Sequence, residues 1–166
     1  MSMIGEYMRL APHDLDVALA DPESVRDLID ELWDLEDEGA EPDARLMDVD
    51  KAWHGLAFVL ERAGVPTAVV HGDARVPGAD DWGYGPPSWL SAERVAELSA
   101  ALRGLDVDAV VGAVPAAVLV AAEVYPLSLW AADSDWRGYL AGHLKRLTDF
   151  FAEAADAGMG MLVWID

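Results

Sequence analysis

The polar residues best spaced for acid–base chemistry lie in the segment DVDKAWHGLAFVL, residues 48–60. Asp50 precedes His54 by four residues, so on a helix the two side chains would share one face, next to Lys51. A carboxylate placed there can hold the imidazole in one tautomer and raise its basicity, which is half of a general-base arrangement. No nucleophile completes it, because no serine stands in a G-x-S-x-G pattern. We expect His54 to pack at the helix edge with one hydrogen bond, and catalysis is the alternative.

Aromatic residues form the second candidate set, because most of them stand at expected loops or helix starts. Aromatic rings with polar tips beside Gly- and Pro-rich turns suit a cleft for a small ligand or for a partner's side chain. They suit equally the pinning of the long loop 73–90 to the core, which is the role we favour for Trp82, Tyr84 and Trp89. The candidate ligand- or partner-binding residues of the two sets are Asp50, Trp53, His54, Tyr84, Tyr125 and Trp130.

The residue types exclude several kinds of site. The chain has no cysteine, which excludes disulfides, thiol nucleophiles and Cys-ligated metals. Its four histidines show neither H-x-x-x-H nor H-E-x-x-H spacing. No calcium-loop pattern and no G-x-x-x-x-G-K-[ST] phosphate loop is present. The sequence therefore predicts no metal and no cofactor.

The charge of the chain is strongly negative. Thirty-one acidic residues against eleven basic ones give a net charge of −20. This field repels the phosphates of nucleic acids and anionic membrane surfaces, so we expect neither as a partner. Charge runs usually mark solvated faces, and we favour that interpretation. The alternative is a surface that attracts a basic protein partner.

The hydrophobic segments predict a soluble, cytoplasmic protein. The N-terminal sequence lacks a basic region followed by an apolar stretch, so it does not resemble a signal peptide. The most apolar region, residues 109–122, is interrupted by Pro115 and falls short of the ~20 residues that span a membrane.

The pattern of apolar residues predicts strands at both ends of the chain, residues 2–10 and 160–166. Helical spacing and N-cap residues (Asp21, Asp48 and Ser91) predict the elements between them. The expected helices cover 14–20, 22–35, 49–63, 92–103, 107–111, 115–124 and 135–157. Residues 34–45 and 73–90 are expected to be irregular, and 125–130 a turn. The pattern of residues 67–72, TAVVHG, fits either a strand or a turn of helix.

Five segments, in order along nearly the whole chain, resemble one known family. They are SMIGEYMRL (2–10), KAWHGLAFVL (51–60), GYGPPSWLSAERV (83–95), EVYPLSLW (123–130) and FFAEAADAGMGMLVWID (150–166). The chain resembles the YfbM-like family, the domain of unknown function 1877. The resemblance implies a small bacterial α+β domain in which several helices surround a small sheet that contains both chain ends. It implies no activity, so no catalytic residues carry over.

Together these observations predict one helix-rich α+β domain over residues 1–166. Two functions remain open. The first is a non-enzymatic binding or interaction module, favoured by the missing catalytic constellation. The second is a small-molecule-binding protein or enzyme with a cleft around Asp50, Trp53, His54, Tyr84 and Tyr125.

Overall fold

The two ends of the chain form neighbouring strands of one sheet in a computed structural model that describes residues 2–130 and 134–166. β1 (Gly5–Leu10) and β5 (Gly160–Ile165) pair along their whole lengths. β2 (Leu46–Asp48) lies outside β1, while β4 (Ser88–Leu90) and then β3 (Ala74–Arg75) continue the sheet beyond β5. Every pairing in the order β2-β1-β5-β4-β3 is antiparallel. The predicted terminal strands and the helix-rich α+β class are confirmed.

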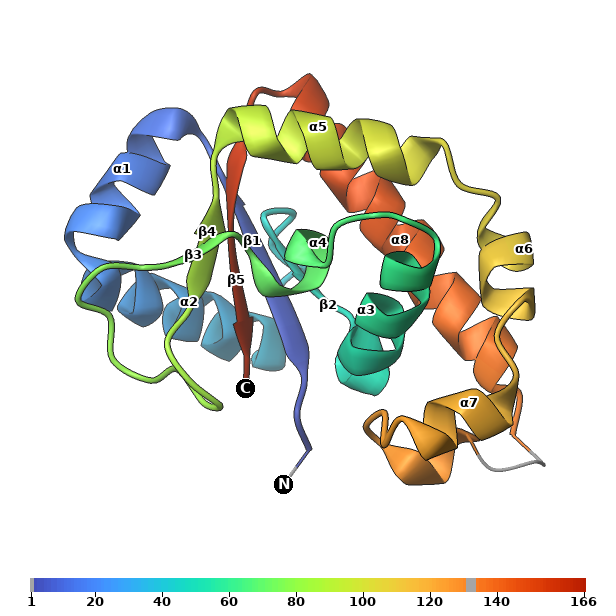
Figure 1. Cartoon of the computed structure of the whole chain (residues 1–166). Coiled ribbons are helices and arrows are strands. Elements are labelled where there is room, and N and C mark those ends of the chain that lie inside the picture. Colours follow the sequence, from blue (N-terminus) through green and yellow to red (C-terminus); the bar gives the residue numbers. More distant parts are fainter. Residues whose placement is uncertain (1, 131–133) are drawn as a thin grey trace.

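Helices cover both faces of this sheet (Figure 1). Since side chains along a strand alternate between the two faces, neighbouring residues of one strand pack against different helices. Tyr7 and Val163 belong to one buried core, and their neighbours Met8 and Leu162 belong to another. Helices α1 (Pro12–Ala20) and α2 (Pro22–Asp37) cover the core that contains Met8 (Figure 1). The terminal strands therefore hold two layers of helices together.

The remaining helices lie on the side of the sheet that Tyr7 faces (Figure 1). The longest, α8 (Trp136–Asp156), places Phe150 and Phe151 edge-on to Tyr7, with ring centroids 6.5 and 6.3 Å away. None of the helices in the described residues is long and apolar enough to cross a membrane. The elements of this layer are η1 (Asp50–Ala52), α3 (Trp53–Arg62), α4 (Ala68–His71), α5 (Ala92–Arg103), α6 (Val107–Gly112), α7 (Ala116–Ala121), η2 (Leu127–Trp130) and α8 (Trp136–Asp156).

Two of the three predicted N-caps are confirmed. Asp21 Oδ1 accepts a hydrogen bond from the Ser24 amide at 3.3 Å, and Ser91 Oγ accepts one from the Arg94 amide at 3.2 Å. The cap predicted at Asp48 is wrong, because its Oδ1 accepts from the amide of Asp50 at 2.8 Å in the turn before η1. The α-helix expected directly after Asp48 begins only at Trp53.

One other prediction of local structure is wrong, one strand was not anticipated, and one open question is answered. Residues 73–90, expected to be irregular, contain β3 and β4, and β2 follows the acidic loop, where no element was predicted. These strands have only two or three residues, and their pairing with longer strands stabilises them more than their own sequence does. Residues 68–71 are helical, and the turn at 125–130 includes η2.

The sheet places the carboxylate of Glu6 in an unfavourable position. It lies opposite Asp48 on β2 and opposite Trp164 on β5. Burial raises the pKa of Glu6 to about 8, and the charges of Asp48 and Asp166 add to the effect. Because an unfolded glutamate titrates near ~4.3, ionising Glu6 costs the folded state free energy that the unfolded state does not lose. Below pH ~4.3, Glu6 is protonated in both the folded and the unfolded state, and its titration does not reduce the free energy of unfolding. As the pH rises from there to the folded-state pKa of about 8, the free energy of unfolding falls.

Glu6→Gln should therefore raise the free energy of unfolding by about 2 kcal/mol at alkaline pH and leave it unchanged at acid pH. Urea unfolding on both sides of the Glu6 titration measures the difference. The exposed Glu31→Gln removes the same charge and should give a much smaller pH-dependent change. Equal effects of the two variants would show that net charge, not the position of Glu6, is responsible.

Candidate functional site

Three of the six candidate residues lie together at the start of α3. The rings of Trp53 and His54 are stacked, with centroids 5.0 Å apart and planes at 9°. The ring of Tyr125 stacks on Trp53 at 6.1 Å. The structure thus brings residues 53, 54 and 125 into one aromatic cluster, which we call the Trp53 cluster.

The polar atoms of this cluster bind the protein's own main chain. His54 Nδ1 accepts a hydrogen bond from the Tyr125 amide at 3.0 Å. Trp53 Nε1 donates to the carbonyl oxygen of Met3 at 3.2 Å, and the amide of Met3 donates to the Tyr125 hydroxyl at 3.1 Å. The cluster therefore fastens the segment before β1 and the turn at Tyr125 to α3. A packing role with a single hydrogen bond, as expected for His54, accounts for these contacts.

Asp50 does not hold the His54 imidazole in the way its spacing suggests. It belongs to η1, where its φ of +46° departs from helical geometry, so the four-residue spacing no longer puts the two side chains on one helix face. Its Oδ2 accepts a hydrogen bond from the hydroxyl of Tyr139 on α8 at 2.9 Å. The carboxylate thus connects η1 to α8 instead of activating a base.

Trp130 is a core residue. It is 1% exposed, its Nε1 donates to the Val124 carbonyl at 2.7 Å, and its ring meets Trp136 edge-on. A Cβ at Gly55 would lie 2.6 Å from its ring, so glycine permits the close approach of α3. Trp130 therefore presents almost no surface to a ligand, and its candidate role in binding stays a prediction that this burial does not favour.

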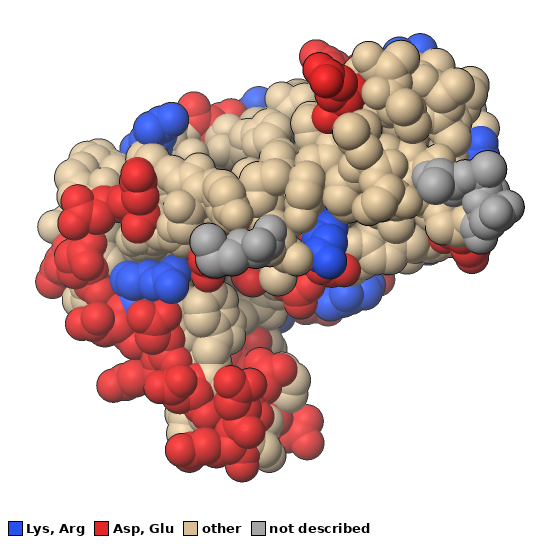
Figure 2. All heavy atoms as spheres, turned by 90° about the horizontal axis from the view of Figure 1, so that it is seen from below, with Lys and Arg blue, Asp and Glu red and all other residues tan. Residues whose placement is uncertain are grey.

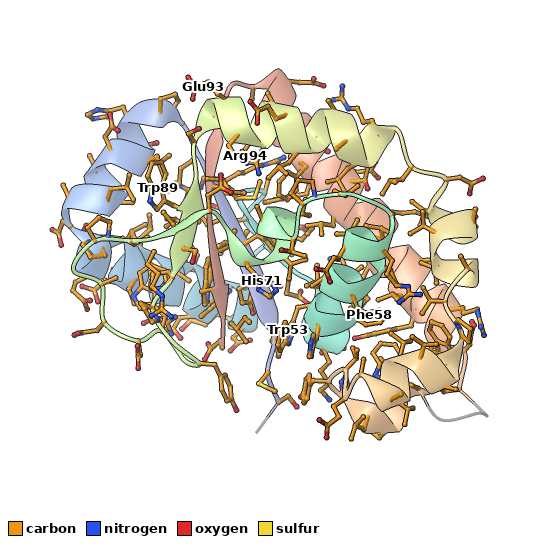
Figure 3. The ribbon with its side chains drawn as sticks, in the orientation of Figure 1. Trp53, Phe58, His71, Trp89, Glu93 and Arg94 are labelled. Carbon is orange, nitrogen blue, oxygen red and sulfur yellow. The ribbon has the colours of Figure 1, made fainter. Side chains whose placement is uncertain are left out.

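The Trp53 cluster continues to a surface pocket through His71, the last residue of α4. The edge of the His71 ring packs on Trp53, with centroids 6.2 Å apart and planes at 75°. Figure 3 shows the two side chains next to each other between α3 and the sheet. His71 in turn lines a pocket of about 290 Å³ that we call the Tyr84 pocket. Its lining residues are Val70, His71, Arg75, Tyr84, Gly85, Pro86, Ser88, Val163, Trp164 and Ile165.

The loop before β4 has one plugging aromatic residue and one free one. Trp82 is 4% exposed and packs edge-on against Trp164, as expected for a residue that pins the loop. Tyr84 is 51% exposed, although its amide donates to the Ile165 carbonyl at 2.9 Å. The main chain of Tyr84 is therefore fixed to the end of β5, while the residue lines the Tyr84 pocket and stays half exposed.

The electrostatic environment keeps the histidines of this region neutral. Partial burial lowers the pKa of His54 below its usual value. Burial also lowers the pKa of His71, and the charge of His54 lowers it further. At neutral pH each ring therefore has one N–H donor and one acceptor nitrogen.

Sequence reasoning missed three polar residues of the Tyr84 pocket: His71, Arg75 and Ser88. His71 lay in a segment of undecided structure, and Arg75 and Ser88 lay in a loop thought irregular. The register that places Arg75 opposite Ser88 is a tertiary pairing, for which the local sequence has no signal. No group of three or more metal-binding side chains occurs in the described residues.

The protein is a helix-rich α+β domain with both chain ends in one antiparallel sheet and a small polar pocket beside β4. The chain matches the model of the family described as "Domain of unknown function (DUF1877)" over residues 1–164, and it belongs to that family. Its fold is similar to the crystal structure of YfbM from Escherichia coli, a protein of unknown function, with a TM-score of 0.69. The two share 17% identity over 98% of this chain and 99% of that one. No curated protein matches the chain.

Substitutions of Trp130 and Tyr84 should have very different effects on the free energy of unfolding, because Trp130 is a core residue and Tyr84 is half exposed. Trp130→Ala should lower the free energy of unfolding by about 3–5 kcal/mol, because it leaves a large cavity. Tyr84→Ala should change it by at most ~0.5 kcal/mol, because the ring is half exposed. Denaturant unfolding of the two variants measures both values. A large loss in Tyr84→Ala would contradict the free ring seen here.

His54→Gln should raise the pKa of His71 by part of the way to its usual value, because at acid pH it removes the charge of protonated His54 while the effect of burial remains. A pH titration of the imidazole resonances by NMR measures the shift. His143→Gln, on α8 beside Tyr139, is the control and should leave the His71 titration unchanged. An unchanged His71 pKa in His54→Gln would mean that the two rings do not interact electrostatically.

Proposed function

We propose that this protein is a non-enzymatic binding module of the cytoplasm that takes a small ligand in the Tyr84 pocket. The observation that supports this most is that the half-exposed Tyr84 lines a pocket while its amide is bound to the Ile165 carbonyl. A concavity in which a few polar groups can orient a ligand is the usual form of a small-molecule site, and His71, Arg75 and Ser88 are such groups here. At about 290 Å³ it is at the small end of such sites, which favours a small metabolite.

The contacts of His54 and Asp50 favour binding over catalysis. A general base needs a free nitrogen directed at substrate and a partner that raises its basicity. Instead, His54 Nδ1 accepts from the Tyr125 amide, and Asp50 accepts from Tyr139. Burial lowers the pKa of His54, which weakens it as a base. His54 and Asp50 therefore help to hold the segment of α3 and η1 whose Trp53 ring packs against His71.

An NMR screen of a small fragment library tests the proposal, with the amide resonances of Tyr84, Gly85 and Ser88 as reporters of the pocket. We expect hits that shift these resonances together. Tyr84→Ala should weaken the binding of the hits roughly tenfold, because it removes the exposed wall of the pocket.

Leu35→Ala is the matched control, since Leu35 on α2 is also 51% exposed and does not line this pocket. It should leave the affinities unchanged. A screen without hits at millimolar fragment concentration would overturn the proposal, as would equal affinities for wild type and Tyr84→Ala.

A further inference from the structure

The Tyr84 pocket differs in charge from the rest of this acidic molecule. Figure 2 shows acidic side chains crowded over the side of the molecule that holds α2. Four other surface pockets each have at least one carboxylate in their lining. Among the described residues, the lining of the Tyr84 pocket contains no aspartate or glutamate, although the chain carries a net charge of −20. An anionic ligand in this pocket would therefore meet no carboxylate among the described lining residues.

Arg75 provides a positive charge at this pocket, and it has no carboxylate partner among the described residues. Within the described residues, six of the eleven basic residues of the chain form ion pairs, and Arg75 is not one of the six. It is exposed on the edge strand β3, opposite Ser88 of β4. Its guanidinium is therefore available to a ligand.

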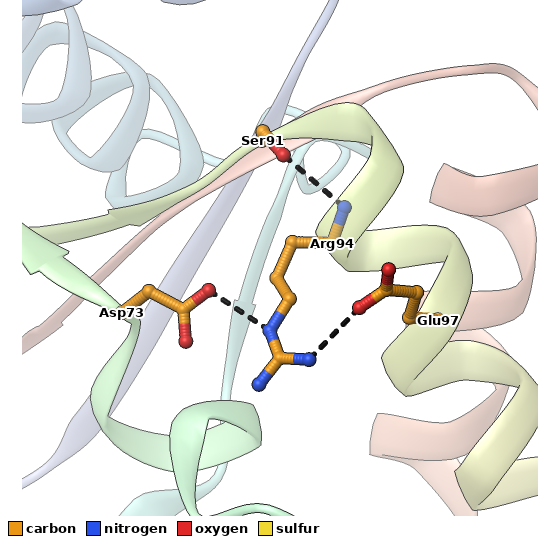
Figure 4. Close-up of polar contacts among 4 residues, drawn as sticks. All are labelled: Asp73, Ser91, Arg94 and Glu97. Atoms are coloured by element: carbon orange, nitrogen blue, oxygen red, sulfur yellow. Dashed lines mark hydrogen bonds and ion pairs between the residues drawn. The ribbon is translucent and has the colours of Figure 1, made fainter.

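The contacts of Arg94 explain why the nearest acidic residue does not neutralise Arg75. Asp73 lies two residues before Arg75 and is its natural partner on an extended segment. Its Oδ2 instead accepts a hydrogen bond from Arg94 Nε at 2.9 Å (Figure 4). Glu97 holds the other end of the guanidinium at 2.9 Å, and the Ser91 cap fixes the turn of α5 that carries Arg94 (Figure 4).

The remaining lining residues provide neutral donors and an apolar wall. The neutral imidazole of His71 has one N–H, and Ser88 has a hydroxyl; both can donate to a carboxylate beside the fork of Arg75. The same lining contains Val70, Pro86 and Tyr84, whose apolar atoms suit an apolar body. A doubly charged phosphate would meet stronger repulsion from the acidic protein than a single carboxylate does.

We propose that the Tyr84 pocket binds a small organic monocarboxylate, with Arg75 holding the carboxylate and Tyr84 covering the apolar body. This inference rests on the proposed function and specifies the ligand class of the same pocket. His71 and Ser88 donate the further hydrogen bonds that orient the carboxylate.

Titration calorimetry with phenylacetate and its neutral analogue phenylacetamide tests the inference. The two probes share an apolar ring and differ in charge. We expect phenylacetate to bind wild type roughly tenfold more tightly than phenylacetamide does. Arg75→Gln should remove this preference by weakening phenylacetate alone, while Arg62→Gln, which removes an equal charge on α3, should leave both affinities unchanged.

Each outcome bears on one proposal. Equal binding of the two probes to wild type, or an unchanged preference in Arg75→Gln, would overturn the carboxylate inference and leave pocket binding intact. Failure of both probes would also overturn it, and the fragment screen then decides separately whether the pocket binds any small molecule.

Discussion

The pairing of β1 with β5 is the constraint on which the rest of the structure depends. These strands are the two ends of the described chain, and they match residue for residue from Gly5 opposite Ile165 to Leu10 opposite Gly160. A slip by one residue would move every side chain to the opposite face and expose residues from both cores. The register therefore sets which helices cover each face. It also fixes the end of β5, where the Ile165 carbonyl holds the loop of Tyr84.

The region around α3 shows how a cluster that looks chemical can be structural. Trp53, His54 and Tyr125 direct their polar atoms at the main chain, where Met3 and the turn at Tyr125 need partners. The ring of Trp53 also packs against the ring of His71. The residues that first suggested catalysis thus position a neighbouring pocket whose own polar groups come from the sheet edge.

Charge in this protein is distributed unevenly, and this matters more than its total. Glu6 is forced into the sheet beside Asp48, where burial raises its pKa to about 8. Arg94 binds Asp73, which leaves Arg75 without an ion-pair partner among the residues that the structure describes. An acidic surface over α2 and a carboxylate-free pocket beside β4 can coexist, because ionic strength screens exposed charges beyond a Debye length of ~8 Å.

The sequence by itself determined the terminal strands, most of the helices and the caps at Asp21 and Ser91, because alternation, helical spacing and capping are local properties. It also grouped Trp53, His54 and Tyr125 as candidates, and the structure brings these three together. It could not determine the partner of Asp50, since one positive φ turned that residue from His54 toward Tyr139. It could not place Trp130 in the core, or bring Arg75, Ser88 and His71 to one pocket. The pocket depends on β3 and β4, which are too short to form without the longer strand β5 and which only the tertiary fold brings to the sheet. The burial of Trp130 depends on the packing of η2 against Trp136 and Gly55.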